Sequence, residues 1–258
     1  MCDRYDRQVR LPGFPDLGQA SLTGARVMVV GAGGLGSALL PYLVGAGVGR
    51  VTICDGDTVS VSNLHRQTLF REGDVGKNKA EIAAETLRQL NSDVAIEALP
   101  RHLSVSDTLE GYTLACACVD SFEARRILSS LCVQHSVPMV SGSAQGWSLH
   151  VQVYPCDRVG LCYSCLNPLS KMDTVRTHQA PAVYGPAVGA AGSVMAGVAL
   201  QCLVAPSAAS EGHDTTATDT PSLGARMLML DMRRWTTRVV KMRSTANPKC
   251  PVCGTGDS

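Results

Sequence analysis

The sequence predicts an α/β fold, with a Rossmann-like, mostly parallel sheet that is extended by antiparallel strands and carries a four-cysteine zinc clip. Three observations predict it. Apolar segments alternate with helical patterns over residues 24–145, which is typical of an open parallel sheet with helices on both faces. After residue 145, apolar and polar residues alternate singly, as they do in antiparallel strands. Two Cys-x-x-Cys pairs lie in this second part.

The first part of the chain predicts strands and helices in turn. Short apolar runs indicate buried parallel strands, and apolar residues at helical spacing indicate helices. Strands are expected at 25–30, 50–55, 93–99, 112–120 and 137–144, and helices at 34–47, 77–90 and 121–136. The sheet formed by these strands is expected to hold whatever site the chain carries.

The second part predicts one antiparallel strand at 147–155 and two more within 225–243, with a turn near 232–235. Residues 187–205 are uncharged and long enough to be tested as a membrane span. Because Gly, Ala and Ser dominate and flanking cations and aromatic residues are missing, we expect a buried, closely packed helix instead. The polar, proline-broken segment 206–221 predicts a mobile surface loop.

Composition narrows the classes of function. The chain has 258 residues, 45% of them hydrophobic and 17% charged, which indicates a globular protein. A net charge of +1 without any basic run argues against nucleic-acid binding. The charged first ten residues lack the apolar stretch of a secretion signal, so we expect a cytoplasmic protein. Its eleven cysteines are then more plausible as metal ligands or reactive thiols than as disulfides.

A glycine motif predicts a nucleotide site. Gly31, Gly33 and Gly36 form a G-x-G-x-x-G pattern, with Gly34 inside it, between an expected strand and an expected helix. Glycines let the backbone approach phosphates, and the helix N-terminus offers free N–H groups. Asp55 ends the next strand, where an acid can accept hydrogen bonds from ribose hydroxyls. These residues alone would favour an NAD-dependent oxidoreductase.

The loop after Asp55 favours different chemistry. Arg66 can give a forked donor to phosphate oxygens, and Lys79 a point charge from the next helix. Asn63 and Gln67 are neutral donors suited to the same oxygens. Hydride transfer does not need several cations near the phosphates, whereas phosphoryl or adenylyl transfer does. The alternative is a solvated loop with incidental charges.

There are two cysteine pairs, Cys162 with Cys165 and Cys250 with Cys253, and each has the spacing that lets two thiolates share one tetrahedral Zn²⁺. Their separation along the chain is compatible with a clip that ties two distant segments together. The alternative is a thioredoxin-like redox motif, which would need a strand–helix junction. Since the second pair lies in a tail between Pro248 and Gly254, we favour a closed, structural zinc site.

Taken together, "RYDRQ", "ARVMVVGAGGLGS", "DGDTVSVSNLHRQTLF", "DVGKNKAE", "CYSC" and "CPVC" resemble the ThiF/MoeB/HesA family, bacterial relatives of ubiquitin-activating enzymes. The resemblance runs from about Arg4 to Gly254. It implies one adenylation domain over 1–258, with a nucleotide-binding part at about 24–145 and a carrier-binding and zinc part at about 146–254. It also implies that ATP and Mg²⁺ are used to adenylate the C-terminal Gly-Gly carboxylate of a small ubiquitin-like sulfur-carrier protein, with release of pyrophosphate.

The resemblance also implies roles for individual residues. Asp55 would hold the ribose, Asp120 would associate with Mg²⁺, and Arg7 would enter the neighbouring subunit's site, which implies a homodimer. The implied catalytic residues are Arg7, Arg66, Lys79 and Asp120. The implied cofactor-binding residues are Gly31, Gly33, Gly34, Gly36, Asp55, Asp57, Asn63, Arg66, Gln67, Lys79 and Asp120.

The sequence departs from the family pattern in three places. His178 stands where some members carry a crossover cysteine, so we expect adenylation without a covalent carrier intermediate on this chain. Ser121 replaces a common Asn after Asp120. No rhodanese-like extension follows Gly254, which implies a separate sulfur donor. A non-catalytic subunit of an activating enzyme is a further alternative, although the intact Asp55, Arg66, Lys79 and Asp120 set argues against it.

Overall fold

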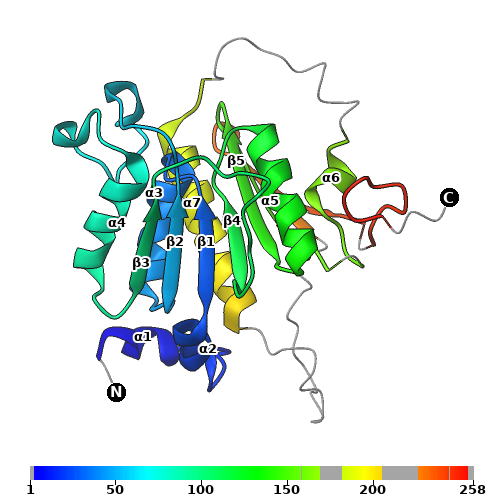
Figure 1. Cartoon of the computed structure of the whole chain (residues 1–258), viewed down its shortest axis with the longest axis horizontal. Coiled ribbons are helices and arrows are strands. Elements are labelled where there is room, and N and C mark those ends of the chain that lie inside the picture. Colours follow the sequence, from blue (N-terminus) through cyan, green and yellow to red (C-terminus); the bar gives the residue numbers. More distant parts are fainter. Residues whose placement is uncertain (1–2, 158, 169–181, 205–225, 244, 255–258) are drawn as a thin grey trace.

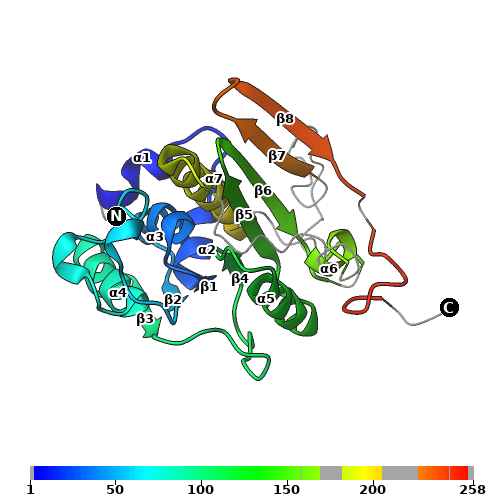
Figure 2. The ribbon, with the colours of Figure 1, turned by 90° about the horizontal axis from the view of Figure 1, so that it is seen from above.

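The computed structural model describes residues 3–157, 159–168, 182–204, 226–243 and 245–254. Within these residues the strands form one sheet in the order β3-β2-β1-β4-β5-β6-β7-β8. Figure 1 shows the part from β3 to β5, and Figure 2 also shows β6, β7 and β8. The strands are β1 (Arg26–Val30), β2 (Arg50–Cys54), β3 (Ala95–Leu99), β4 (Leu114–Ala117), β5 (Met139–Gln145), β6 (Ser148–Tyr154), β7 (Arg226–Asp231) and β8 (Thr236–Lys241).

Strands β1 to β5 pair in parallel, and β6 to β8 add to them in antiparallel fashion. The change of direction follows from connection length. A long connection returns the chain to the start of each parallel strand, whereas β5 to β6 and β7 to β8 are joined by tight turns. The predicted fold class is confirmed, including the turn between residues 231 and 236.

Helices cover both faces of the sheet (Figure 2). One face packs against α2, α3, α4 and α7, and the other against α5 and α6. The helices are α1 (Asp6–Val9), α2 (Gly18–Gly24), α3 (Gly34–Gly45), α4 (Lys79–Leu90), α5 (Phe122–His135), α6 (Tyr163–Leu166) and α7 (Gly185–Val204), and the short 3-10 helices are η1 (Asp3–Tyr5), η2 (Val61–Asn63) and η3 (Glu72–Asp74). Successive apolar residues of β1 pack alternately into the hydrophobic cores on the two faces of the sheet. A strand that is buried on both faces in this way has a continuous apolar sequence.

Helix α7 is long and apolar enough to cross a membrane by length and composition. It instead packs between α3 and the β5–β6 part of the sheet, with Ala191, Met195 and Ala199 fully buried. Its small residues allow this close contact, because a Cβ at Gly192 would overlap the carbonyl oxygen of Leu35. The prediction of a buried core helix is confirmed. The loop expected at 206–221 lies outside the described residues.

Candidate nucleotide site and cysteine cluster

The predicted nucleotide residues gather at the carboxyl ends of the parallel strands, around the point where β1 and β4 lie side by side. The chain leaves β1 toward α3 on one face and leaves β4 toward α5 on the other. Such a divergence opens a crevice in which α/β folds bind ligands. The backbone N–H of Cys118 donates to Val30 O at 2.8 Å, so the segments after both strands stay together.

At two positions of the motif, neighbouring backbone atoms leave no room for a side chain. Gly31 has a φ of +97°, and a Cβ there would lie 2.5 Å from Cys118 O. A Cβ at Gly36 would overlap Gly31 O. Gly33 is the N-cap of α3, and no side chain among the described residues caps that helix, so its first N–H groups can receive an anion. Gly34 has a packing role, because a Cβ there would meet Val188 of α7 at 2.5 Å.

Asp55 ties the end of β2 to the glycine loop. Its Oδ2 accepts from Ala32 N–H at 2.7 Å, and its Oδ1 accepts from Asp57 N–H at 2.9 Å. Burial raises the pKa of this carboxyl, and the two backbone hydrogen bonds oppose that rise. Each oxygen keeps a second lone pair, which leaves Asp55 able to accept a ribose hydroxyl as expected.

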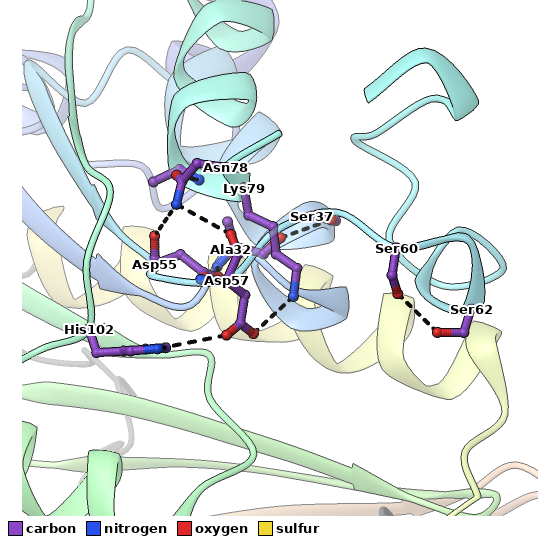
Figure 3. Close-up of polar contacts among 10 residues, drawn as sticks. Ala32, Ser37, Asp55, Asp57, Ser60, Ser62, Asn78, Lys79 and His102 are labelled. Carbon is purple, nitrogen blue, oxygen red and sulfur yellow. Dashed lines mark hydrogen bonds and ion pairs between the residues drawn. The ribbon is translucent and has the colours of Figure 1, made fainter. Parts of the chain in front are cut away.

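Lys79 brings a buried cation to the same edge of the sheet (Figure 3). Its Nζ lies 3.0 Å from Asp57 Oδ2, and its side chain is 7% exposed against 58% for Asp57. Asn78 caps α4 by accepting from the N–H groups of Ala80 and Glu81. The amide of Asn78 also donates to the carbonyl oxygens of Asp55 and Asp57, at 3.1 and 3.3 Å. The start of α4 is therefore fixed to the end of β2.

The loop carrying Asn63, Arg66 and Gln67 folds over the glycine motif. The carbonyl of Asn63 accepts from the N–H groups of Arg66 and Gln67, each at 3.0 Å. Arg66 Nη1 donates to Ser62 O at 3.0 Å, which turns the guanidinium partly toward its own loop. Gln67 is 4% exposed, and its Nε2 lies 3.4 Å from where a Cβ of Gly33 would be. Its Oε1 has no hydrogen-bond partner among the described residues.

Asp120 and Arg7 lie at opposite ends of the parallel strands. Asp120 is exposed just beyond β4, and Ser121 caps α5 by accepting from Ala124 N–H at 3.3 Å. Ser121 thus has a capping role at the position where Asn was expected. Arg7 lies on α1, below the ends where the parallel strands begin (Figure 1). One chain therefore does not bring Arg7 to the other predicted site residues. His178 lies outside the described residues.

Two residues beside the site were not predicted. Asn78 is one, although its position just before a helical pattern is the usual signal of an N-cap. His102, in the loop after β3, is the other, with Nε2 3.9 Å from Asp57 Oδ1. No sequence pattern indicates that the loop after β3 reaches Asp57.

The four predicted zinc ligands converge. The Sγ atoms of Cys162, Cys165, Cys250 and Cys253 all lie within 4.8 Å of one another. Neighbouring Sγ atoms are separated by 3.8 Å for Cys162–Cys165, 3.6 Å for Cys162–Cys250 and 3.3 Å for Cys165–Cys253. Four thiolates about 2.3 Å from one Zn²⁺ in a tetrahedron would be roughly 3.8 Å apart. The donor set therefore fits Zn²⁺, and it ties the tail after β8 to α6.

The chain is similar in sequence to known adenylyltransferases. Over 254 residues the chain is 37% identical to the molybdopterin-synthase adenylyltransferase of Salmonella typhimurium, covering 97% of this chain and 96% of that protein. It is 37% identical over 260 residues to the sulfur carrier protein adenylyltransferase of Thermus thermophilus, covering 98% and 90%.

The fold also matches solved structures. A crystal structure of E. coli MccB with ATP superposes with a TM-score of 0.79 and 23% identity, over 98% of this chain and 74% of that chain. A likeness at this identity supports the fold. The family assignment comes from a sequence model that matches residues 5–252, nearly the whole chain. The chain belongs to the ThiF family.

Proposed function

We propose that the protein is an ATP-dependent adenylyltransferase that activates the C-terminal Gly-Gly carboxylate of a small ubiquitin-like sulfur-carrier protein. The observation that carries this proposal is the buried Lys79 cation, which pairs with Asp57 close to Asp55, the residue that binds the glycine loop before α3. Negative charge that develops on phosphates is offset there by a fixed cation and free N–H groups. The names of the two relatives support both the reaction and the class of substrate.

The chemistry assigns a task to each group. The carrier carboxylate attacks the α-phosphorus of ATP, a new C–O–P link forms, the Pα–O–Pβ link breaks, and pyrophosphate leaves. The α3 N-terminus and Lys79 hold phosphate oxygens, while Asp55 holds the ribose. The exposed carboxylate of Asp120 offers a ligand for Mg²⁺, a hard cation that would neutralise charge on the phosphates when bound. Arg66 would move its guanidinium from Ser62 O to a phosphate oxygen.

An NAD-dependent oxidoreductase is the alternative that the glycine motif and Asp55 would allow. Lys79 argues against it, since a pyrophosphate bridge bound by a glycine loop does not need a buried cation beside it. The non-catalytic alternative is disfavoured because Asp55, Lys79 and Asp120 lie at the same edge of the sheet. Cytoplasmic location, a separate sulfur donor and the division at about residue 145 belong to the same proposal.

A homodimer with shared sites would explain why Arg7 lies away from the other site residues. Under this proposal Arg7 acts in the partner's site. Mixing an Arg7→Ala protein with a Lys79→Met protein should restore one intact site in a mixed dimer. Activity that stays at the level of the separate variants after subunit exchange would contradict shared sites.

The function is tested by carrier-dependent exchange of labelled pyrophosphate into ATP. Candidate carriers are small ubiquitin-like proteins that end in Gly-Gly, each with a matched control that lacks the final glycine. We expect exchange with one intact carrier and none with its shortened form. ATP binding without exchange across the carriers, or exchange that does not require the final glycine, would contradict carboxylate activation.

A further inference from the structure

Arg125 is a buried cation that lies outside the proposed phosphate and metal set. It belongs to α5, on the face of the sheet opposite α3, and only 8% of the residue is exposed. A buried guanidinium is unfavourable unless its N–H groups are hydrogen-bonded. The partners of Arg125 therefore indicate what this side chain holds in place.

Two of its partners are backbone carbonyls near the site, and a third is the hydroxyl of Tyr163, while Nε has no hydrogen-bond partner among the described residues. Nη2 donates to Val119 O at 2.5 Å and to Gly142 O at 2.8 Å. Val119 directly precedes Asp120, and Gly142 lies in the middle of β5. One nitrogen thus joins the turn after β4 to the neighbouring strand. The positive charge of Arg125 also acts on a neighbouring thiol. Burial raises the pKa of the Cys118 thiol to about 12, and Arg125 opposes that rise.

The same turn is held from its other side by β1. Cys118 N–H donates to Val30 O, and Cys118 O lies against Gly31, leaving no room for a Cβ there. The peptide between Val119 and Asp120 is planar, so fixing Val119 O also fixes the N–H and the Cα direction of Asp120. The Asp120 side chain is itself exposed, so its backbone must supply its orientation.

We propose that Arg125 is a positioning residue that aims the Asp120 carboxylate at the divalent cation of the ATP complex, without contacting the nucleotide. The inference rests on the proposed function, which assigns Asp120 to that cation. Because Arg125 acts through Asp120, replacing both residues should weaken binding of the divalent cation no more than replacing Asp120 alone. A residue that merely stabilised the fold would instead affect metal-free ATP binding as well.

The experiment uses Mn²⁺ in place of Mg²⁺, on zinc-loaded protein, and measures Mn²⁺ affinity for the protein–ATP complex by electron paramagnetic resonance. We expect Arg125→Met to weaken Mn²⁺ binding about tenfold, within the range of coupled neighbours, and Arg125→Lys to restore part of it. Metal-free ATP affinity should stay within about twofold of wild type. The double variant Arg125→Met with Asp120→Asn should match Asp120→Asn.

Arg126→Met, on the same helix, is the matched control and should bind Mn²⁺ like wild type. Melting temperature and zinc content establish that each variant is folded. If Arg125→Met does not fold, the single and double variants are made with Arg125→Lys instead. The weaker Mn²⁺ binding that Arg125→Lys causes in wild type should then be absent when Asp120→Asn is already present. The proposal would be overturned if the fold-losses of Mn²⁺ affinity in the two single variants multiplied in the double variant. Unchanged Mn²⁺ affinity in the folded Arg125→Met variant would overturn it as well. Failure of wild type to bind ATP would instead overturn the proposed function.

Discussion

The environment of Lys79 supports the proposed phosphate site. Its ammonium group is almost fully buried, yet its partner Asp57 is largely exposed. A buried cation with an exposed partner is a poor way to stabilise a fold, because water weakens the pair while burial still penalises the charge. The arrangement is better explained by a ligand that supplies further negative charge.

Replacing Lys79 tests this explanation. We expect Lys79→Met to lower carrier-dependent pyrophosphate exchange by about 10²-fold, the effect of removing one preorganised donor at a transferring group. Its melting temperature should change little, because Asp57 is already solvated. Lys77→Met is the control, since Lys77 is exposed and pairs with Asp74 in the same loop. Equal exchange in both variants would remove Lys79 from the phosphate site.

The Arg101–Asp107 pair gives a prediction of pH dependence. Two hydrogen bonds of 2.6 and 2.9 Å from Arg101, with a third from Ser104 N–H, hold the pKa of the Asp107 carboxyl below its usual range. A lowered pKa adds stability above the ordinary value of about 3.9, and that stability is lost as pH falls toward the folded value.

Asp107→Asn should therefore unfold more easily than wild type at pH 7, by about 1 kcal/mol because Arg101 is half exposed. The difference in urea denaturation should shrink as pH falls below about 4. Asp16→Asn, at an exposed carboxyl, is the control for an Asp-to-Asn change on the surface. A difference that is constant from pH 7 to pH 3 would indicate that packing, rather than the charge, is responsible.

At the scale of elements, the sequence predicts the strands and the longer helices α3, α4, α5 and α7, but not the short helices α2 and α6 or the contacts between the ends of elements. Apolar runs and helical periodicity depend on local burial, so they predict the strands and the buried helix α7. The capping of Asp55 and Asp57 carbonyls by Asn78, and the reach of Arg125 to Val119, depend on how separate elements pack. Residue spacing carries no information about such packing. The cysteine cluster was predictable because Cys-x-x-Cys spacing is itself a local feature.

The contact between α3 and α7 can be tested with a matched pair of glycines. Gly192→Ala should destabilise the protein by about 1–3 kcal/mol, because its Cβ would meet Leu35 O and Ala38 and push the helices apart. Gly197→Ala lies on the same helix with open space around its Cβ, and should be neutral or stabilise by up to about 1 kcal/mol. Chemical denaturation measures both. The same sign for the two variants would contradict this packing.

At the scale of the whole molecule, the cysteine cluster joins distant parts of the chain. Cys162 directly precedes α6 and Cys165 lies within it. α6 packs on α5, where Tyr163 N–H donates to Ser129 Oγ at 3.2 Å. The other two follow β8, at the far edge of the sheet. A metal held by all four would connect the end of the sheet to the helix that carries Arg125.

Removing one ligand tests this connection. Cys250→Ser should release zinc and lower the melting temperature by roughly 5 °C or more, since metal binding adds to folding free energy. Cys202→Ser is the control, because Cys202 lies on α7 away from the cluster. Zinc near one per chain in Cys250→Ser would contradict the four-ligand site. Zinc lost equally from both variants would contradict it as well.

The most direct measurement is calorimetric binding of ATP with Mg²⁺, compared with NAD and NADP, on protein assayed for zinc. We predict that ATP binds and that neither dinucleotide does, because Lys79 and the α3 N-terminus would form a triphosphate site. Tight NAD binding without ATP binding would mean that the glycine motif and Asp55 serve a dinucleotide, and would contradict adenylation.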